Sequence, residues 1–190
     1  ISQLEGIAFG DAYAVGPSGE VYVKGINTGI WRIDPAGSVN LLTEGWIERR
    51  MQNLDLSIYD VRMAWSFRQK GLHVYVVPKV TGPRVIESFW WDAKAGGWWM
   101  DEWSDEAVAP TCVTIWDGDE PGDRGVVIGC QDGMLRVEDE NALNDGSKRI
   151  ESEVILGPLT PADAEQVLFT ALEPVLVGKP GYGGVWLKVY

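Results

Sequence analysis

Short apolar runs separated by glycine-containing turns dominate this sequence, and they constrain the fold more than any other feature. The runs are about five to seven residues long and rich in β-branched and aromatic side chains, which is typical of β-strands. Turn signals such as Lys70-Gly71 and Asp132-Gly133 separate them. We predict strands at residues 19–24, 29–34, 61–67, 72–77, 85–91, 97–101, 111–116, 126–130 and 134–138.

The composition suits many short elements around one core. The chain has 190 residues, of which 45% are hydrophobic, and it contains 23 Gly, 10 Pro and 10 Trp. This apolar fraction is typical of a globular protein rather than a disordered one. No apolar run approaches the ~18 residues of a membrane-spanning helix, and we recognise no signal peptide. The best helix candidate starts at Thr160, with Pro161 at the first helical position.

The chain also contains an internal repeat. Gly19–Asp34 and Gly125–Asp139 each include two glycines four residues apart, followed by an apolar-apolar-Arg-apolar-acidic run. The two glycine pairs lie 104 residues apart, which equals two periods of 52, and Gly71 opens another apolar run one period after Gly19. Four short strands in a repeat of about 40–50 residues are typical of a β-propeller blade.

The sequence therefore predicts an all-β fold of antiparallel four-stranded blades that form part of a β-propeller. Residues 1–160 would hold about three blades with a period of about 52 residues, and residues 161–190 would continue as strands of a further blade or of an adjoining β-domain. Residues 164–172 carry apolar side chains at helical spacing, but we favour a strand over residues 166–177. Pro174 would end a helix by residue 173, and it also disfavours a central strand. From Ile1 and the apolar final segment, Val185–Tyr190, we expect the chain to be part of something longer.

Negative charge is concentrated in one segment. The formal net charge is −12, and residues 101–153 hold 15 acidic and 4 basic residues, whereas the remainder holds 13 and 12. An acidic segment of this strength repels the phosphates of nucleic acid. Its simplest interpretation is a solvated face.

Cysteine and histidine are rare. Cys112 and Cys130 are the only cysteines, which is not a disulfide framework and suits folding in a reducing compartment. Thr111–Trp116 and Val126–Cys130 fit neighbouring strands. If their hairpin is symmetric about residue 121, Cys112 lies opposite Cys130 on one sheet face, and we predict that both thiols are free. The single histidine, His73, alternates with residues 75 and 77 and is interpreted as structural.

Tryptophan clusters in one hairpin, which we expect to turn over residues 93–96. Alternation then places Trp90 opposite Trp98 or Trp99 as a cross-strand pair. Blades that pack face to face need large flat side chains between them, so we interpret the tryptophans as packing residues. On an exposed rim they would instead stack on sugars, which leaves a carbohydrate site as the alternative. The predicted packing residues are Trp31, Trp90, Trp91, Trp98, Trp99 and Trp116.

Residue patterns for catalysis are weak. Asp117–Asp123 places acids at the first, third and seventh positions of an EF-hand-like loop, but Pro121 and Ile128 stand where ligands are needed. Four further acids are interpreted as surface residues, because nothing orders two of them at a fixed separation. These acids are Asp101, Glu102, Asp105 and Glu106. We therefore predict no catalytic, cofactor-binding or metal-binding residue and no enzymatic activity.

Three stretches carry the motifs of a known family. Gly19–Asp34 has a strand, a turn and a Gly-Ile-aromatic-x-aliphatic-Asp run, and Glu87–Trp99 has an aliphatic-aromatic-Asp-x-x-x-Gly-x-Trp hairpin. Val127–Val137 has a Gly-x-x-Asp-Gly-x-aliphatic hairpin, which the outgoing run Ile150–Leu159 follows. In these motifs, which together touch most of residues 1–160, the chain resembles the propeller proteins of tailed-phage tails, the nozzle-type and tail-stabilisation proteins between portal and tail tip.

The resemblance implies a structural virion protein, a ring-forming nozzle- or adaptor-type tail component around the DNA channel. Its partners would be other copies of itself in a ring and neighbouring tail or portal-adaptor proteins. DNA would pass through without specific binding, and no membrane or cofactor would be involved. The protein would be assembled in the host cytoplasm and located in the virion tail. A carbohydrate-binding propeller is the alternative, and the lack of a convergent catalytic set disfavours a hydrolase propeller.

Overall fold

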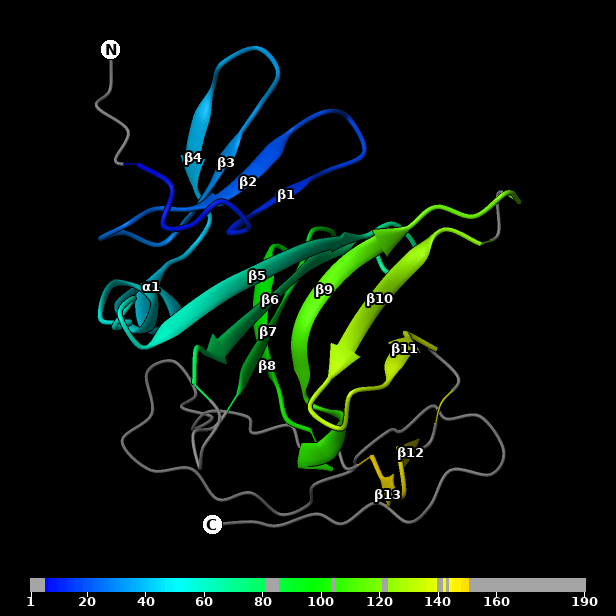
Figure 1. Cartoon of the computed structure of the whole chain (residues 1–190). Helices are drawn as coiled ribbons and strands as arrows, with labels where there is room; N and C mark the ends of the chain where they lie inside the picture. The colour runs from blue at the N-terminus through cyan, green and yellow to red at the C-terminus, as the bar shows by residue number, and fades with distance from the viewer. Residues whose placement is uncertain are drawn as a thin grey trace, which may run out of the picture. The chain divides into compact units, whose positions relative to one another are not determined.

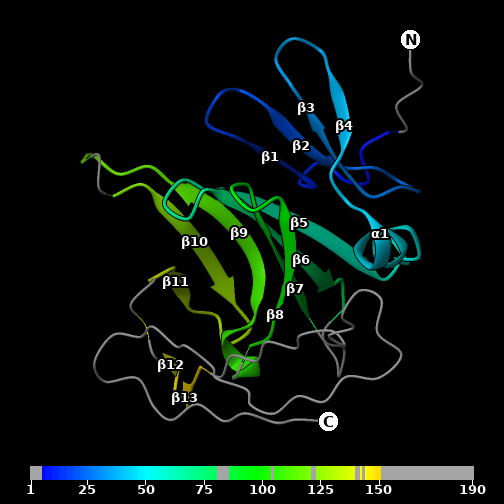
Figure 2. The same cartoon turned by 180° about the vertical axis from the view of Figure 1, so that it is seen from behind.

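The chain folds into antiparallel β-sheets that follow one another in sequence, so the all-β prediction is confirmed (Figure 1, Figure 2). The computed structural model describes residues 6–80, 86–103, 105–120, 123–139, 142 and 144–150, all within one compact unit. The predictions for residues 161–190 and the helix expected to start at Thr160 lie outside the described residues, as does most of the outgoing run Ile150–Leu159.

The first sheet is a meander of four short strands. They are β1 (Tyr13–Val15), β2 (Val21–Lys24), β3 (Ile30–Ile33) and β4 (Val39–Leu41), and they pair in that order. β2 and β3 fall within predicted runs. Sequence reasoning misses β1 and β4, because a three-residue strand has too little periodicity to be recognised.

The second sheet repeats the meander with longer strands. β5 (Tyr59–Ser66), β6 (Gly71–Pro78), β7 (Glu87–Asp92) and β8 (Gly97–Asp101) again pair in chain order. Each of these strands was expected from alternating apolar residues between glycine turns. The longer strands give this sheet a wider face on both sides.

A short helix that the sequence analysis did not predict links the first two sheets. α1 (Gly45–Gln52) buries Ile47 and Met51, which stand four residues apart as helical periodicity requires. In its last turn, Arg50 forms an ion pair with Glu87 of β7, in which the Nε–Oε2 distance is 2.7 Å. The helix is thereby held against the second sheet.

The third sheet has three described strands, in the order β11-β10-β9. They are β9 (Pro110–Trp116), β10 (Gly125–Cys130) and β11 (Leu135–Val137). A two-stranded hairpin of β12 (Asn144–Asp145) and β13 (Lys148–Arg149) follows. All nine predicted strands are therefore present, with ends displaced by two residues at most.

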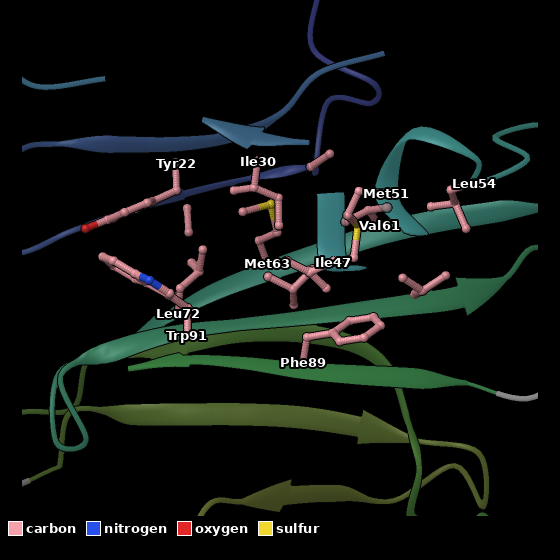
Figure 3. Packing of buried hydrophobic residues seen from close by; sticks show 14 of the residues in the cluster. Tyr22, Ile30, Ile47, Met51, Leu54, Val61, Met63, Leu72, Phe89 and Trp91 are labelled. Atoms are coloured by element: carbon pink, nitrogen blue, oxygen red, sulfur yellow. The ribbon is translucent and has the colours of Figure 1, made fainter. Parts of the chain in front are cut away.

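One face of the second sheet packs on the first sheet (Figure 3). Tyr22 of β2 stacks on Trp65 of β5, with ring centroids 5.1 Å apart and planes inclined by 11°, and Trp91 of β7 tilts against both rings. Large aromatic rings thus fill the layer between the sheets. From β5, β6 and β7 this layer contains Val61, Met63, Trp65, Leu72, Val74, Val76, Phe89 and Trp91.

The opposite face of the second sheet packs on the third sheet. Ala64 and Tyr75 point to this side, where they join a buried cluster with Val126 and Ile128 of β10. Burial raises the pKa of the Tyr75 hydroxyl well above its usual range, so the group stays neutral. The second sheet is therefore covered on both faces, and residues 71–77 of β6 are all buried.

The three sheets stack in chain order, with their first strands next to each other. β5 contacts β1 of the preceding sheet and β9 of the following one, as Figure 1 shows. Tyr22 of β2 faces the second sheet and Tyr75 of β6 faces the third, so the second strands of the first two sheets each turn a tyrosine toward the sheet that follows. Successive sheets are therefore stacked in the same orientation, each using one face toward the preceding sheet and the other face toward the following one. Among the described residues no sheet closes on itself.

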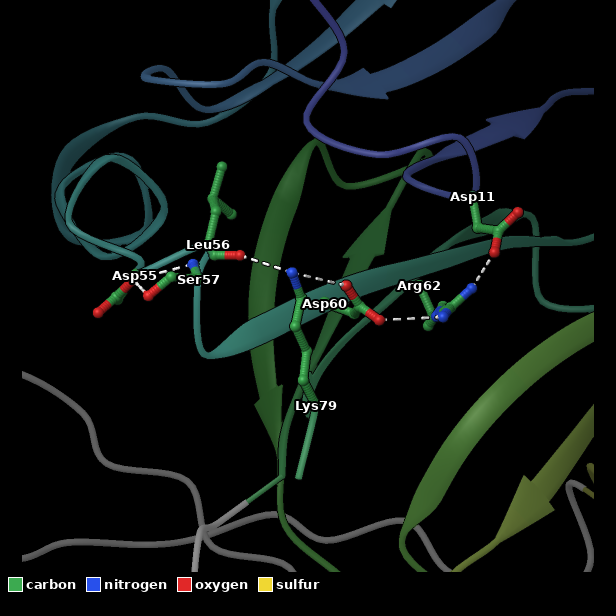
Figure 4. Close-up of polar contacts among 7 residues, drawn as sticks. All are labelled: Asp11, Asp55, Leu56, Ser57, Asp60, Arg62 and Lys79. Atoms are coloured by element: carbon green, nitrogen blue, oxygen red, sulfur yellow. Dashed lines mark hydrogen bonds and ion pairs between the residues drawn. The ribbon is translucent and has the colours of Figure 1, made fainter. Parts of the chain in front are cut away.

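An ion pair between Arg62 and Asp11 also connects the first two sheets, and it continues into a row of polar contacts along the start of the second sheet (Figure 4). Arg62 of β5 pairs with Asp11, which precedes β1, and with Asp60, at 3.1 Å. Lys79 lies 3.6 Å from Asp60 and donates a 2.8 Å hydrogen bond to the carbonyl oxygen of Leu56. Exposed ion pairs contribute only ~0–1 kcal/mol each, so the apolar layers supply most of the attraction between sheets.

Gly71, the first residue of β6, lies where a side chain does not fit. A Cβ atom there would lie 2.3 Å from the carbonyl oxygen of Trp91 and 2.3 Å from the indole ring of Trp90. Gly71→Ala is therefore expected to lower the free energy of unfolding by about 1–3 kcal/mol, because β6 and β7 must move apart. Gly97→Ala is the control, since a Cβ atom there meets nothing within 4 Å. Urea unfolding measures both, and equal values would contradict the prediction.

Candidate functional site

The tryptophan hairpin of β7 and β8 turns over residues 93–96, where the sequence predicts it. Trp90 pairs with Trp99, and Trp91 pairs with Trp98. The carboxylate of Asp92 accepts two hydrogen bonds from backbone N–H groups of the turn, at 2.7 and 3.1 Å. The hairpin therefore presents one tryptophan pair on each face of the second sheet.

The two pairs have different surroundings. Trp91 is buried in the layer between the first and second sheets, and Trp98 is half-buried against it. On the other face, Trp90 is half-buried beside His73, but Trp99 is 53% exposed. The expectation that Trp99 packs between blades is not met by the described residues. The reason is that β9 and β10 contact β5 and β6, whereas Trp99 lies on the edge strand β8.

A hollow of about 360 Å³ opens beside the buried pair. Among the described residues, three tryptophans line it, Trp46, Trp91 and Trp98, and Glu44 is the one charged lining residue. The indole N–H of Trp98 donates a 3.0 Å hydrogen bond to the carbonyl of Leu42. The volume is at the small end of ligand pockets, which run from ~300 to ~1,000 Å³. Trp46 was missed from the sequence because it lies on α1, outside the hairpin.

The prediction that the two cysteines face each other is wrong. Cys112 pairs with Gly129, and Cys130 pairs with Pro110 beyond a register shift. β10 begins at Gly125, so the connecting loop covers residues 117–124 and the register differs by one residue from the predicted one. Such a shift moves every side chain of one strand to the other face. Cys112 is consequently exposed, Cys130 is buried, and both thiols are free.

The first sheet has an apolar outer face. Ala14, Tyr22 and Ile30 point toward the second sheet, so their neighbours along each strand point away from it. We call the side that points away the trailing face. It consists of Tyr13, Val15, Val21, Val23, Trp31, Ile33, Val39 and Leu41, none of them charged. Tyr13 and Val15 are 47% and 50% exposed.

The third sheet has an apolar outer face of its own. Val126 and Ile128 point toward the second sheet, so the alternate residues point away. We call this side the leading face. It consists of Cys112, Thr114, Trp116, Gly125, Val127, Gly129, Leu135 and Val137, again without a charge. Trp116, Leu135 and Val137 are 60%, 74% and 59% exposed.

Two of the predicted packing residues lie on these outer faces. Trp31 is half-buried on the trailing face, and its indole N–H donates a 2.8 Å hydrogen bond to the hydroxyl of Thr28. Trp116 is exposed on the leading face. Neither side chain lies in a layer between two described sheets, so the packing prediction is not met for either by the described residues. Alternation in the sequence indicates on which sheet face Trp31 and Trp116 lie, but it does not indicate whether another sheet packs on that face.

His73 occupies a structural position in β6. Its ring stacks on Tyr75, with centroids 5.9 Å apart, and lies 4.4 Å from the ring centroid of Trp90. Its Nε2 atom lies 2.8 Å from a carboxylate oxygen of Glu138, an ion-pair distance without hydrogen-bond geometry. The histidine thus connects the second sheet to the chain that leaves β11.

The candidate acids do not converge within the described residues. There, no group of three or more His, Cys, Asp or Glu side chains is arranged to hold a metal ion. Asp105 instead caps a 3₁₀ turn, η1 (Glu106–Val108). Its carboxylate accepts hydrogen bonds from the N–H of Ala107, at 3.2 Å, and from the hydroxyl of Ser147, at 3.1 Å, and these bonds lower its pKa. The loop of residues 117–123 is described only in part.

Asp132, in the turn between β10 and β11, is expected to titrate well below an ordinary aspartate. Its carboxylate accepts hydrogen bonds from Arg136, at 2.8 and 2.6 Å, and from the N–H of Met134, at 3.0 Å, which lower its pKa to about 2. Because the folded pKa is depressed, the stabilisation is present above the unfolded value of ~3.9 and is lost as pH falls through about 2. NMR titration of the side-chain carboxyl carbon measures this pKa. Arg136→Gln should raise it, and a wild-type value near ~4 would contradict the prediction.

No protein-family model, no curated protein and no solved structure matches this chain. Within the described ranges, the helices are too short or too polar to cross a membrane. The fold nevertheless defines a class, namely an all-β protein built from antiparallel meander sheets that stack face to face.

Proposed function

We propose that this chain is a structural component of a tailed-phage tail, in which the three sheets are consecutive blades of a β-propeller. The stacking carries the proposal, because successive meanders pack face to face with first strand beside first strand. Propeller blades are four-stranded sheets arranged around a central channel. The second strands begin at residues 21, 71 and 125, about 50 residues apart, which fits a blade repeat.

The positions of the family motifs support the tail assignment. Gly19–Asp34 contains the hairpin of β2 and β3, Glu87–Trp99 contains most of β7 and β8, and Val127–Val137 contains most of β10 and β11. Each motif therefore coincides with a hairpin of a different sheet. In a ring-forming nozzle- or adaptor-type protein, such hairpins present loops to other copies and to neighbouring tail or portal-adaptor proteins. This role is architectural and uses no catalytic residue or cofactor.

The strong negative charge of the chain is compatible with a protein that lines a channel through which DNA passes. Residues 101–153 hold 15 acidic and 4 basic residues, so phosphates find few cations there. DNA would slide through the tail channel formed by the ring of copies without specific binding. We therefore expect no mobility shift of duplex DNA by the chain, even at ~50 mM salt, where nonspecific binding is strong.

The decisive test is to look for the chain in the particle. An antibody against the chain should label the tails of purified tailed particles from cells that carry its gene. Mass spectrometry should find its peptides in isolated tails and not in isolated heads. Tailed particles that lack the chain would overturn the proposal.

Carbohydrate binding is the second candidate, and the hollow lined by Trp46, Trp91 and Trp98 favours it. Indole faces stack on sugar rings, and the carboxylate of Glu44 can accept hydrogen bonds from sugar hydroxyls. Quenching of tryptophan fluorescence by a glycan panel tests this function. Binding that is lost in Trp46→Ala but kept in Trp116→Ala would support it, and no quenching by any glycan would exclude the panel's sugars as ligands.

A further inference from the structure

We infer that the leading face of one copy of this chain packs on the trailing face of a second copy, and that two copies thereby close a ring of six sheets. The inference rests on the propeller arrangement proposed above and names the surface and the partner that complete it.

The direction of the stack selects which faces meet. Tyr22 faces the second sheet and Tyr75 faces the third, so each sheet joins the next through the same side of its second strand. A fourth sheet that continued this order would pack on the leading face of the third sheet. The surface it would use corresponds to the trailing face of the first sheet. The first sheet of a second copy takes this place.

The chemistry of the two faces agrees with this pairing. Every side chain of the trailing face is aliphatic or aromatic, and the leading face adds only Thr114 and Cys112 to aliphatic and aromatic residues and glycines. Large exposed apolar patches are uncommon on monomeric proteins and mark association sites. Trp116 and Leu135, both more than half exposed, are the large apolar side chains that such an interface would bury.

Two copies are enough to close the ring. The three sheets formed by the described residues of each copy give six, within the range of ~4–8 blades found in propellers. A two-fold axis then relates the copies, and it generates two identical contacts, each between one leading and one trailing face. Because β5 contacts β1 and β9 within the chain, β9 of one copy should lie beside β1 of the other.

A cross-linking experiment exploits the exposed native thiol. Cys112 lies on β9 in the leading face, whereas Val15 lies on β1 in the trailing face, and Cys130 is buried and protected. Val15→Cys, treated with a short bis-maleimide, should give a covalent dimer through Cys112 of the other copy. Val80→Cys, at a 64% exposed valine outside both faces, is the matched control and should give none. The wild-type chain should also give none, because Cys112 would not meet its own equivalent.

A second experiment removes the contact without disturbing the fold. Leu135→Glu places a charge on the leading face at a side chain that is 74% exposed, so the monomer should keep its circular dichroism spectrum. We expect it to raise the dimer dissociation constant at least ~30-fold, as loss of an interface hot spot does. The neighbouring Met134→Glu, at a residue outside both faces, should leave the dimer intact. Sedimentation equilibrium measures both constants.

Several results would overturn the inference. A wild-type monomer at micromolar concentrations, a closed assembly other than a dimer, or a dimer that Leu135→Glu leaves intact would each do so. Cross-linking of wild-type chains through Cys112 would show that two leading faces meet instead. These outcomes are separable from the tail assignment, because a monomer found in tails would refute only the contact, and a dimer absent from particles would refute only the assignment.

Discussion

Replacing Ile128 with aspartate is expected to lower the free energy of unfolding by about 4 kcal/mol or more, which is a large part of the ~5–15 kcal/mol of a typical domain. Ile128 of β10 is 7% exposed and points into the cluster that Ala64 and Tyr75 of the second sheet share. Arg136 of β11 is its cross-strand partner, but that guanidinium already forms two hydrogen bonds with Asp132, so a carboxylate placed there competes for an engaged cation in an otherwise apolar cluster. Unfolding in urea, followed by tryptophan fluorescence, measures the loss.

The adjacent residue supplies the control for this prediction. Val127 lies on the leading face, so a carboxylate introduced by Val127→Asp points to solvent in the single chain. We expect its cost to stay below about 1.5 kcal/mol at concentrations where the chain is monomeric. A larger loss for Val127→Asp than for Ile128→Asp would mean that the faces of β10 are reversed.

Replacing Trp91 with alanine is expected to cost about 3–5 kcal/mol, because it empties a large volume between two sheets. The Trp91 side chain is in contact with the rings of Tyr22, Trp65 and Trp98. Thermal or urea unfolding of the single variant measures the effect directly.

The matching variant on the other face of the hairpin is Trp99→Ala. Trp99 is 53% exposed on the edge strand β8, so its removal leaves little empty volume and should cost less than about 1 kcal/mol. Equal losses for the two variants would show that another part of the molecule covers Trp99. This pair therefore separates the buried tryptophans from the exposed ones by their energies.

Alternation and turn chemistry were sufficient to predict most of the strands. The run from Gly71 to Val77 is apolar and β-branched between glycine turns, and it forms β6 as predicted. β1 and β4, with three residues each, have no period that could be measured. The helix α1 covers eight residues, and only the spacing of Ile47 and Met51 could have indicated it.

The strand register of the β9–β10 hairpin could not be predicted from the sequence, because it depends on whether the connecting loop has an odd or an even number of residues. Loop residues 117–124 are eight, whereas a hairpin centred on residue 121 requires an odd number. That single residue decides whether Cys112 faces Cys130 or Gly129. Burial was equally inaccessible, because Trp91 and Trp99 occupy similar sequence contexts but only Trp91 has a sheet packed over it.

The double coverage of β6 has a consequence for how the molecule opens. Its hydrogen-bonded partners are β5 and β7, and both of its faces lie under another sheet. Fluctuations that detach the first or the third sheet leave these hydrogen bonds in place, so the amide protons of Leu72 to Val77 should exchange with solvent only through global unfolding. Those of β1 and β11, three residues each, should exchange through local openings many times faster. The slowest amide protons in the chain would then report its thermodynamic stability directly.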